Sequence, residues 1–246
     1  MKKLVLAVVI MLFIIPACNK DDKYAQWSGI GTIEKLIASS DEFEIVLDGG
    51  QRLVPNKIIV NNNYENGDRI FVKYSITKTV DANNYEVDLY DIDRILTKDI
   101  IQLTASIKDS IGNDPVYMNE ENIWISNNYI NFIFSYYGAY KIHHINLVKL
   151  YENTHTEDGR LILEFRHNAH DDFSNVLMNG VVSFNLESLK ETNMDSVQFV
   201  VRVKEYNDNS LEWEGSYLFS NPLKSTKEVA VLPKNNNLQI STEYLK

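Results

Sequence analysis

The chain is patterned almost throughout as short runs in which apolar and polar residues alternate. In its first part we identify such runs over residues 29–37, 43–47, 51–54, 69–76 and 85–90. A period of two residues, bounded by turn-forming segments such as Asp48-Gly49-Gly50, is typical of β-strands with one buried face. About five strands within roughly seventy residues match the number and size of a small OB-type barrel.

From residue 99 onward the apolar runs are longer and the loops between them are wider. Residues 123–126 and 129–137 predict a hairpin around Asn127-Asn128. Further strands are predicted over residues 142–151, 161–165, 181–186, 197–206, 211–219 and 229–232. These segments predict a β-sandwich of seven or more strands after the barrel, and no segment has a sustained helical period, so we expect an all-β chain.

The second arm of the predicted hairpin has two distinct faces. One face, expected in the core, carries Ile130, Phe132, Phe134 and Tyr136. The opposite face carries Tyr129, Ile133 and Tyr137. This second face either packs against another layer of the protein or meets solvent.

The first seventeen residues follow a different pattern. Lys2 and Lys3 precede twelve consecutive apolar residues, 4–15, and Pro16-Ala17 follow. A transmembrane helix needs roughly 20 apolar residues, so this segment is too short to span a bilayer. A basic start, a short apolar stretch and a small residue before the cleavage point predict a secretory signal peptide over residues 1–17.

Ile15-Pro16-Ala17-Cys18 resembles a bacterial lipobox, and this resemblance implies that Cys18 is acylated, for example with palmitate, and becomes the new N-terminus. Residues 18–26 then form a lipidated tether that attaches the protein to a membrane. The alternative is an ordinary signal peptide whose cleavage site contains a cysteine. Cys18 is the only cysteine, so an intrachain disulfide is excluded.

Lys20, Asp21 and Asp22 follow the cysteine closely. They resemble the signal, a lysine with two acids, by which some Gram-negative bacteria send lipoproteins to the outer surface. This resemblance implies an outer-membrane lipoprotein exposed at the cell surface. The alternative is a polar spacer that carries no localisation signal.

The charge of the chain excludes one class of partner. The net charge is −10, and it becomes −12 without residues 1–17, which contain two lysines and no acid. Binding to nucleic acid rests on neutralising phosphates with basic residues, so we expect no nucleic-acid partner. An acidic surface also binds anionic lipid poorly, so membrane attachment must come from the acyl group.

Two further segments, together with the lipoprotein signal and the strand pattern, resemble the NigD-like family: Asn66-Gly67-Asp68-Arg69-Ile70 and Ile95-Leu96-Thr97-Lys98. This family pairs an N-terminal OB domain with a C-terminal β-sandwich and carries no catalytic signature. We therefore expect a barrel over residues 27–98, closed by the second segment, and a sandwich over 99–246.

Histidines and carboxylates in the second half are candidates for a metal site: His143, His144, His155, His167, His170, Asp171 and Asp172. Side chains of these types ligate zinc or calcium. However, His167 and His170 point to opposite faces if the strand continues through them, and they converge only if the chain turns sharply after residue 167. We predict no metal site and no cofactor.

Seven aromatic residues lie between Trp124 and Tyr140. Those outside the predicted core face are candidates for a binding surface, namely Tyr129, Tyr137 and Tyr140. Exposed tyrosines can stack on sugar rings or contact a protein, so a surface protein or a glycan is the expected partner.

The sequence favours a non-enzymatic, lipid-anchored protein for binding or assembly, because no nucleophile elbow, zinc-protease motif or phosphate loop is present. One alternative is a surface glycan hydrolase with paired carboxylates, which would face each other at roughly 5–10 Å. A second alternative, implied only by the family's name, is a bacteriocin-associated immunity or accessory protein.

Overall fold

A computed structural model describes residues 25–35, 43–57, 64–172, 175–220 and 245–246. The signal segment, Cys18, Lys20, Asp21, Asp22 and the strand expected over 229–232 lie outside the described residues. No helix within the described ranges has the length and apolarity that crossing a membrane requires.

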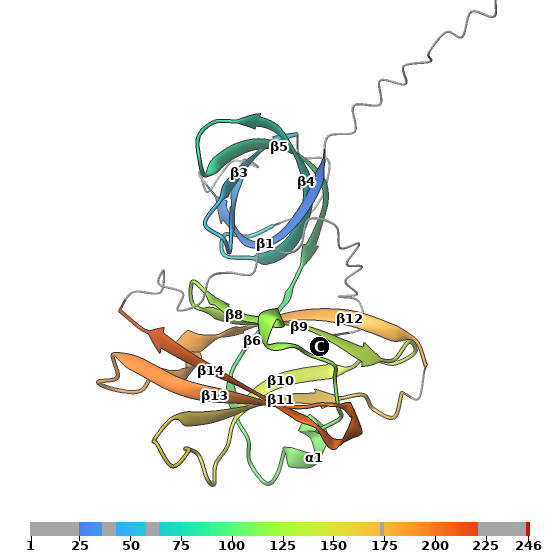
Figure 1. Ribbon diagram of the computed structural model, residues 1–246, viewed down its shortest axis with the longest axis vertical. Helices are drawn as coiled ribbons and strands as arrows, with labels where there is room; N and C mark the ends of the chain where they lie inside the picture. The colour runs from blue at the N-terminus through green and yellow to red at the C-terminus, as the bar shows by residue number, and fades with distance from the viewer. Residues whose placement is uncertain (1–24, 36–42, 58–63, 173–174, 221–244) are drawn as a thin grey trace, which may run out of the picture.

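The first unit is a closed five-stranded barrel in the order β1-β2-β3-β5-β4 (Figure 1). Its strands are β1 Gln26–Lys35, β2 Phe43–Leu47, β3 Arg52–Lys57, β4 Arg69–Thr79 and β5 Asn84–Arg94. The alternating residues fill its interior, with Ile33, Ile45, Leu53, Val87 and Leu89 fully buried. The predicted OB-type barrel is confirmed.

Gly31 closes this barrel. It lies opposite Leu47 of β2 on one side and Ile70 of β4 on the other. A Cβ atom at residue 31 would lie 2.6 Å from the carbonyl oxygen of Val46, which is shorter than a van der Waals contact. Because glycine has no Cβ, β1 can bend here and pair with two neighbours.

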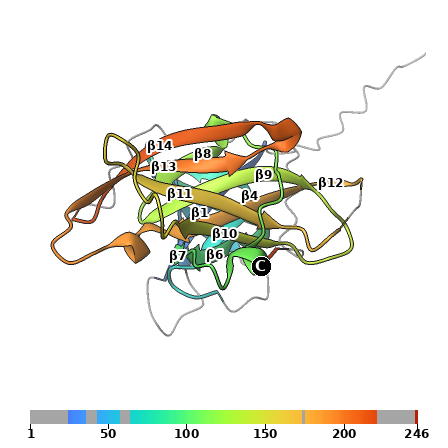
Figure 2. The ribbon, with the colours of Figure 1, turned by 90° about the horizontal axis from the view of Figure 1, so that it is seen from below.

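The second unit is a β-sandwich of two sheets (Figures 1 and 2). The first has the order β14-β13-β11-β10-β7, formed by Ser210–Leu218, Ser196–Lys204, Leu161–Asn168, His144–Lys149 and Ile101–Gln102. The second has the order β6-β12-β9-β8, formed by Leu96–Asp99, Leu177–Asn185, Tyr129–Tyr137 and Ile123–Ser126. Short helical segments connect the strands: α1 Lys108–Ile111, η1 Glu120–Asn122, η2 Leu186–Leu189 and η3 Tyr206–Asp208.

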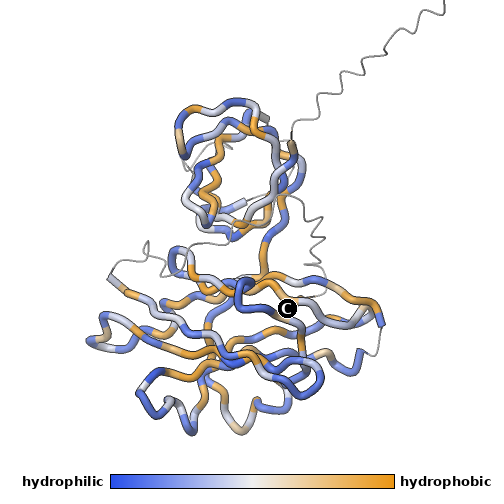
Figure 3. Tube along the Cα trace, viewed as in Figure 1, coloured by the Kyte–Doolittle hydropathy of each residue, from blue (hydrophilic) through white to orange (hydrophobic). Residues whose placement is uncertain are grey.

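The core of the sandwich lies between the two sheets, and apolar segments line both inner faces (Figure 3). Ile130, Phe132, Phe134 and Tyr136 of β9 are all at most 1% exposed, as their alternation predicted. The rings of Phe132 and Phe134 both contact Phe165 of β11 in the opposite sheet, with centroid distances of 5.0 and 5.2 Å. The predicted β-sandwich is confirmed.

The barrel packs on the outer face of the four-stranded sheet (Figure 1). A small apolar cluster joins them, formed by Ile30, Phe71, Ile95, Trp124, Ile133 and Val181. The sequence left open whether Ile133 packs against a second layer or meets solvent. In the structure it packs against the barrel.

β6 departs from the expected division of the chain. Leu96–Asp99 pairs in parallel with β12, from Val182 to Asn185, and so belongs to the sandwich. The segment expected to close the barrel thus crosses to the other unit directly after Ile95. β11 also differs, because it continues to Asn168, three residues beyond its predicted end at Phe165.

Candidate functional site

Three tyrosines from separate parts of the chain meet on the surface of the sandwich. The ring centroid of Tyr117 lies 4.4 Å from that of Tyr206 and 6.0 Å from that of Tyr137. Tyr137 and Tyr206 are 5.5 Å apart, and the Tyr206 hydroxyl accepts a hydrogen bond from the backbone N–H of Tyr137. Each ring thus supports the other two.

The strand register places the apolar residue Leu177 beside this cluster. Tyr137 lies opposite Leu177 of β12, and Ser135, two residues earlier, lies opposite Tyr117. Directly opposed residues share a face of a sheet, so Tyr117, Tyr137 and Leu177 all lie on the outer face.

We call Tyr117, Tyr137, Tyr206 and Leu177 the tyrosine surface. Tyr117, Tyr137 and Leu177 are 41%, 37% and 52% exposed. The barrel covers another part of the same outer face, around Ile133 and Val181, and the tyrosine surface lies outside that contact. Large apolar side chains gathered beside one another on a surface mark binding sites more often than scattered ones do.

Carboxylates flank the tyrosine surface. Asp114 acts electrostatically on Tyr206, whose pKa is raised mainly by burial. Glu205 precedes Tyr206 and lies opposite Val116. Lys204 precedes Glu205 at the end of β13. Two carboxylates, Asp114 and Glu205, and one cation, Lys204, thus lie next to Tyr206 in the described part of the chain.

The predicted binding aromatics do not form one site. Tyr137 belongs to the tyrosine surface, and Tyr140 lies in the loop after β9 and is 82% exposed. Tyr129 is at the other end of β9, where the Arg69 guanidinium lies 5.2 Å from its ring centroid. Tyr117 and Tyr206 were missed, since each stands outside the aromatic-rich segment and nothing in the sequence brings them to Tyr137.

The histidines separate into two groups. His143 and His167 are buried, and His143 Nδ1 lies 2.7 Å from His167 Nε2. His170 and Asp171 adopt left-handed backbone conformations, with φ of 50° and 56°, so the chain does turn sharply there. The ring of His170 packs against that of His144, with 4.4 Å between the centroids. Within the described part of the chain, no three potential ligands are arranged to hold a metal ion.

Asp172 anchors this end of the sandwich. Its carboxylate Oδ2 accepts hydrogen bonds from the backbone N–H groups of residues 139, 140 and 141, at 2.8–3.0 Å, and lies 3.4 Å from His143 Nε2. Burial alone would raise its pKa, but the three N–H donors and His143 outweigh burial and hold the pKa below its usual range. The ionised carboxylate thereby fixes the loop that carries Tyr140.

The two imidazoles share too few hydrogens when both are neutral. Three contacts need one N–H each: His143 to Asp172, His143 to His167, and His167 Nδ1 to the carbonyl oxygen of Pro115 at 3.3 Å. Two neutral rings supply two N–H groups. Burial nevertheless lowers the pKa of His143, and it lowers that of His167 to about 4. Burial thus favours the neutral form of both rings, and one of the three contacts then lacks a hydrogen. We call this buried cluster of His143, His167 and Asp172 the histidine clasp.

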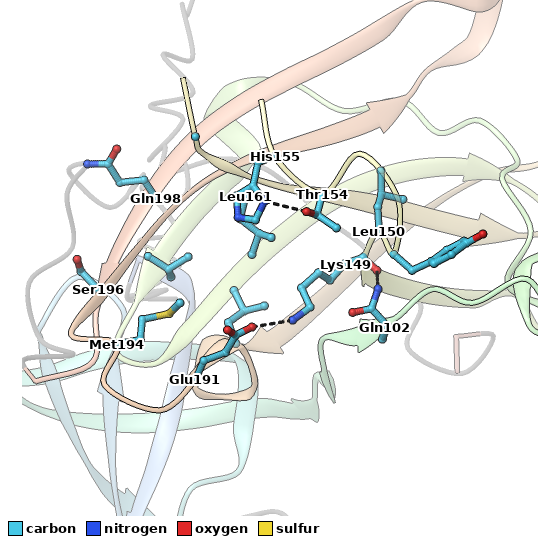
Figure 4. A pocket seen from close by; sticks show the side chains of 14 residues that line it. Gln102, Lys149, Leu150, Thr154, His155, Leu161, Glu191, Met194, Ser196 and Gln198 are labelled. Carbon is cyan, nitrogen blue, oxygen red and sulfur yellow. Dashed lines mark hydrogen bonds and ion pairs between the residues drawn. The ribbon is translucent and has the colours of Figure 1, made fainter. Parts of the chain in front are cut away.

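A pocket of about 570 Å³ opens at another end of the sandwich (Figure 4). It is lined by the end of β10, the loop before β11, the residues after η2 and the start of β13. His155 and Glu191 are on its walls, so His155 lies apart from the buried histidines. Among the residues that line it, Glu191 is the only carboxylate.

Comparisons with known proteins agree with this architecture. Residues 30–95 match the family model of the NigD-like N-terminal OB domain, and residues 99–217 match that of the NigD-like C-terminal β-sandwich domain. No curated protein matches the chain.

Solved structures of similar fold come from species of Bacteroides and Parabacteroides. A Bacteroides vulgatus protein of unknown function has 27% identity and a TM-score of 0.64, with 84% of this chain and 99% of that one covered. A toxin-related protein of Parabacteroides distasonis has 28% identity and a TM-score of 0.65, with 78% and 93% covered. A NigD-like immunity protein of Bacteroides caccae has 13% identity and a TM-score of 0.58, with 80% and 98% covered.

Proposed function

This chain belongs to the NigD-like family, and we propose that it is a lipid-anchored, non-enzymatic envelope protein that binds a partner protein through the tyrosine surface. The observation that carries this proposal is the mutual packing of Tyr117, Tyr137 and Tyr206 on the part of the outer sheet face that the barrel leaves accessible.

The N-terminal sequence supports the anchor. A short apolar segment followed by Pro16-Ala17-Cys18 suits acylation of Cys18 after export. Stable attachment needs more than one acyl chain, because each buried CH₂ contributes only about 0.8 kcal/mol. Lys20, Asp21 and Asp22 support transfer to the outer face of a Gram-negative outer membrane. On this basis the tyrosine surface is presented outside the cell.

The chemistry of the tyrosine surface indicates what it binds. Tyrosine is enriched at the centre of protein interfaces because it offers a large apolar area together with a hydroxyl group. A cation above a tyrosine ring is favoured, and the nearby Asp114 and Glu205 add to that attraction. The partner surface that fits is therefore apolar and carries lysine or arginine.

Two observations support a non-enzymatic role over glycan hydrolysis. The described pocket has one carboxylate in its lining, Glu191, whereas a glycosidase needs a facing pair. The His143–His167–Asp172 cluster resembles a catalytic set only in composition, because all three residues are at most 7% exposed. A reacting group would have to displace the loop bonded to Asp172 in order to reach it.

The immunity role named for the Bacteroides caccae protein is not extended to this chain. At 13% identity that similarity shows a shared fold and no more. Among the described residues, the tyrosine surface is a more specific guide to function than that name is.

Crosslinking on intact cells tests the proposal. Wild-type protein and the Tyr117→Ser, Tyr137→Ser double variant are crosslinked with an amine-reactive reagent and purified. We expect a partner adduct in the wild type that falls at least about tenfold in the double variant, since two central aromatic contacts are lost. Tyr90→Ser is the matched control, because Tyr90 is 47% exposed but lies on the barrel. Equal adducts in all three proteins would contradict the proposal.

A further inference from the structure

The pocket in Figure 4 is separate from the tyrosine surface. Ser196 and Val197, at the start of β13, line the pocket, whereas Tyr206 follows the end of that strand at Lys204. A strand rises about 3.3 Å per residue, so the nine residues of β13 hold the two sites well apart. The pocket can therefore have a ligand of its own.

The floor of the pocket is apolar. Leu161, Leu189 and Val197 line it and are 8%, 4% and 6% exposed, and Met194 lies beside them. These residues belong to the edge of the sandwich core, so their positions are fixed by packing. A ligand with an apolar face can lie on this floor and displace water from it.

The walls of the pocket are polar, and their charges cancel. Lys149 Nζ donates to Glu191 Oε1 at 3.1 Å, and the two side chains meet across the pocket (Figure 4). An ammonium group has three N–H donors and a carboxylate accepts at both oxygens, so this pair can bind each other and a ligand hydroxyl at once. A charged ligand would gain from one partner and be repelled by the other.

Neutral side chains supply further directed groups. The Gln102 amide nitrogen donates a hydrogen bond to the carbonyl oxygen of Lys149 at 2.8 Å, so its oxygen can serve as an acceptor for a ligand. His155 Nδ1 lies 2.8 Å from Thr154 Oγ1, so Nε2 is the ring nitrogen available to a ligand. Gln198 adds a second amide at the start of β13.

We propose that this pocket binds a neutral saccharide. A sugar ring has an apolar C–H face that matches the floor, and its hydroxyls donate and accept, as the amides, imidazole and ion pair of the walls require. The volume of about 570 Å³ is within the range of roughly 300–1,000 Å³ that small-ligand sites occupy. A short oligosaccharide, free or at the end of a glycan, is therefore the ligand.

Calorimetric titration of the purified full-length protein tests this inference. The probes are maltotriose, xylotriose and chitotriose, with trigalacturonate and trilysine as charged comparators. We expect at least one neutral trisaccharide to bind with a Kd of about a millimolar or lower. Absence of binding by all three neutral probes, or tighter binding of a charged comparator, would overturn the inference.

Two variants place the binding in the pocket. Ser196→Trp fills the pocket from an exposed position, and Ser210→Trp is its matched control, since each serine is exposed and opens one of the two paired strands β13 and β14. We expect Ser196→Trp to abolish binding and Ser210→Trp to retain it. Glu191→Gln removes the charge but keeps the size and shape of the side chain. We expect it to weaken binding about tenfold.

Binding unchanged in Ser196→Trp would overturn the inference, because the sugar would then be bound elsewhere. The outcome is independent of the proposed protein partner. The Tyr117→Ser, Tyr137→Ser variant keeps the pocket, so it should bind the trisaccharide with unchanged affinity even where its crosslinked adduct is lost.

Discussion

Arg69 and Asp48, both on the barrel, form a bidentate ion pair at the interface with the sandwich, with Nη1–Oδ1 and Nη2–Oδ2 distances of 2.6 and 2.7 Å. Their side chains are 0% and 3% exposed. Residues of the sandwich complete the pair, since the Trp124 indole N–H donates to Asp48 Oδ2 at 2.8 Å and Arg69 donates to Asn131 Oδ1 at 2.7 Å. Neither charge would be as well satisfied if the two units separated.

Asp48→Asn should therefore reduce the free energy of unfolding by about 3–5 kcal/mol, because it leaves the Arg69 charge buried without its counter-ion. Urea denaturation of the full-length protein measures this change. The control is Asp91→Asn, which breaks the exposed pair with Lys73, in which both side chains are 44% exposed, and should cost less than about 1 kcal/mol. Equal small losses in both variants would show that water reaches Arg69.

Phe71 and Val72 allow a test of how the barrel depends on the sandwich. Phe71 packs outward in the joining cluster, whereas its neighbour Val72 lies in the barrel core. In the full chain, Phe71→Ala should cost about 3–5 kcal/mol, the usual loss for a buried phenylalanine. In a fragment of residues 23–98, which we predict to fold alone, Phe71 has no partner surface, so the same change should cost less than about 1 kcal/mol.

Val72→Ala is the control for this comparison, and it should destabilise chain and fragment alike. Thermal melting followed by circular dichroism provides both measurements. A fragment that does not melt cooperatively would mean that the barrel has no stability without the sandwich, and the predicted autonomy of the barrel would be lost.

The lipid anchor has its own test at the N-terminus. Cys18→Ser removes the thiol that would be acylated, so we expect the protein to leave the membrane fraction or to remain as an uncleaved precursor. Replacing Lys20, Asp21 and Asp22 together by alanine should retain the acyl group but remove access of added protease on intact cells. Mass spectrometry of the N-terminal peptide checks acylation, and an unmodified wild-type Cys18 would disprove the anchor.

Much of the fold could be predicted because local alternation of apolar and polar residues identifies the strands and their buried faces. In β9 the alternation of Ile130, Phe132, Phe134 and Tyr136 identifies the buried face, since side chains of a strand point alternately to its two sides. The barrel strands are predicted for the same reason. What alternation cannot supply is the partner of each face, and for Ile133 that partner is a separate unit of the chain.

The features that the sequence did not predict depend on distant pairings. Leu96–Asp99 belongs to the sandwich because it pairs with Val182 to Asn185, more than eighty residues later. Tyr117 and Tyr206 reach Tyr137 only because residue 117 pairs with residue 135 and η3 follows β13. Likewise, His143 meets His167 because β10 and β11 are antiparallel neighbours. Such registers are set by packing between elements, which no single segment encodes.

His167 makes stability depend on pH. Its pKa is near 6.5 in an unfolded chain and about 4 in the fold, because burial opposes the charged ring. Between these values the unfolded state binds more protons, so stability is complete above about pH 6.5 and falls as the pH is lowered towards 4. His143 and His144, whose pKa values are also lowered, act in the same direction. Asp172 has a lowered carboxylate pKa, so its contribution is lost only below about pH 4.

We expect the free energy of unfolding to fall by about 3 kcal/mol or more between pH 7 and pH 4.5. His167→Gln should be less stable than the wild type at pH 7 but should lose less on acidification, since glutamine does not titrate. His155→Gln, at an exposed position in the pocket wall, is the control and should follow the wild-type curve. Urea denaturation at half-unit pH steps measures all three proteins. A wild-type stability that is constant or increases from pH 6.5 to pH 4.5 would show that the histidine clasp is already protonated in the folded protein.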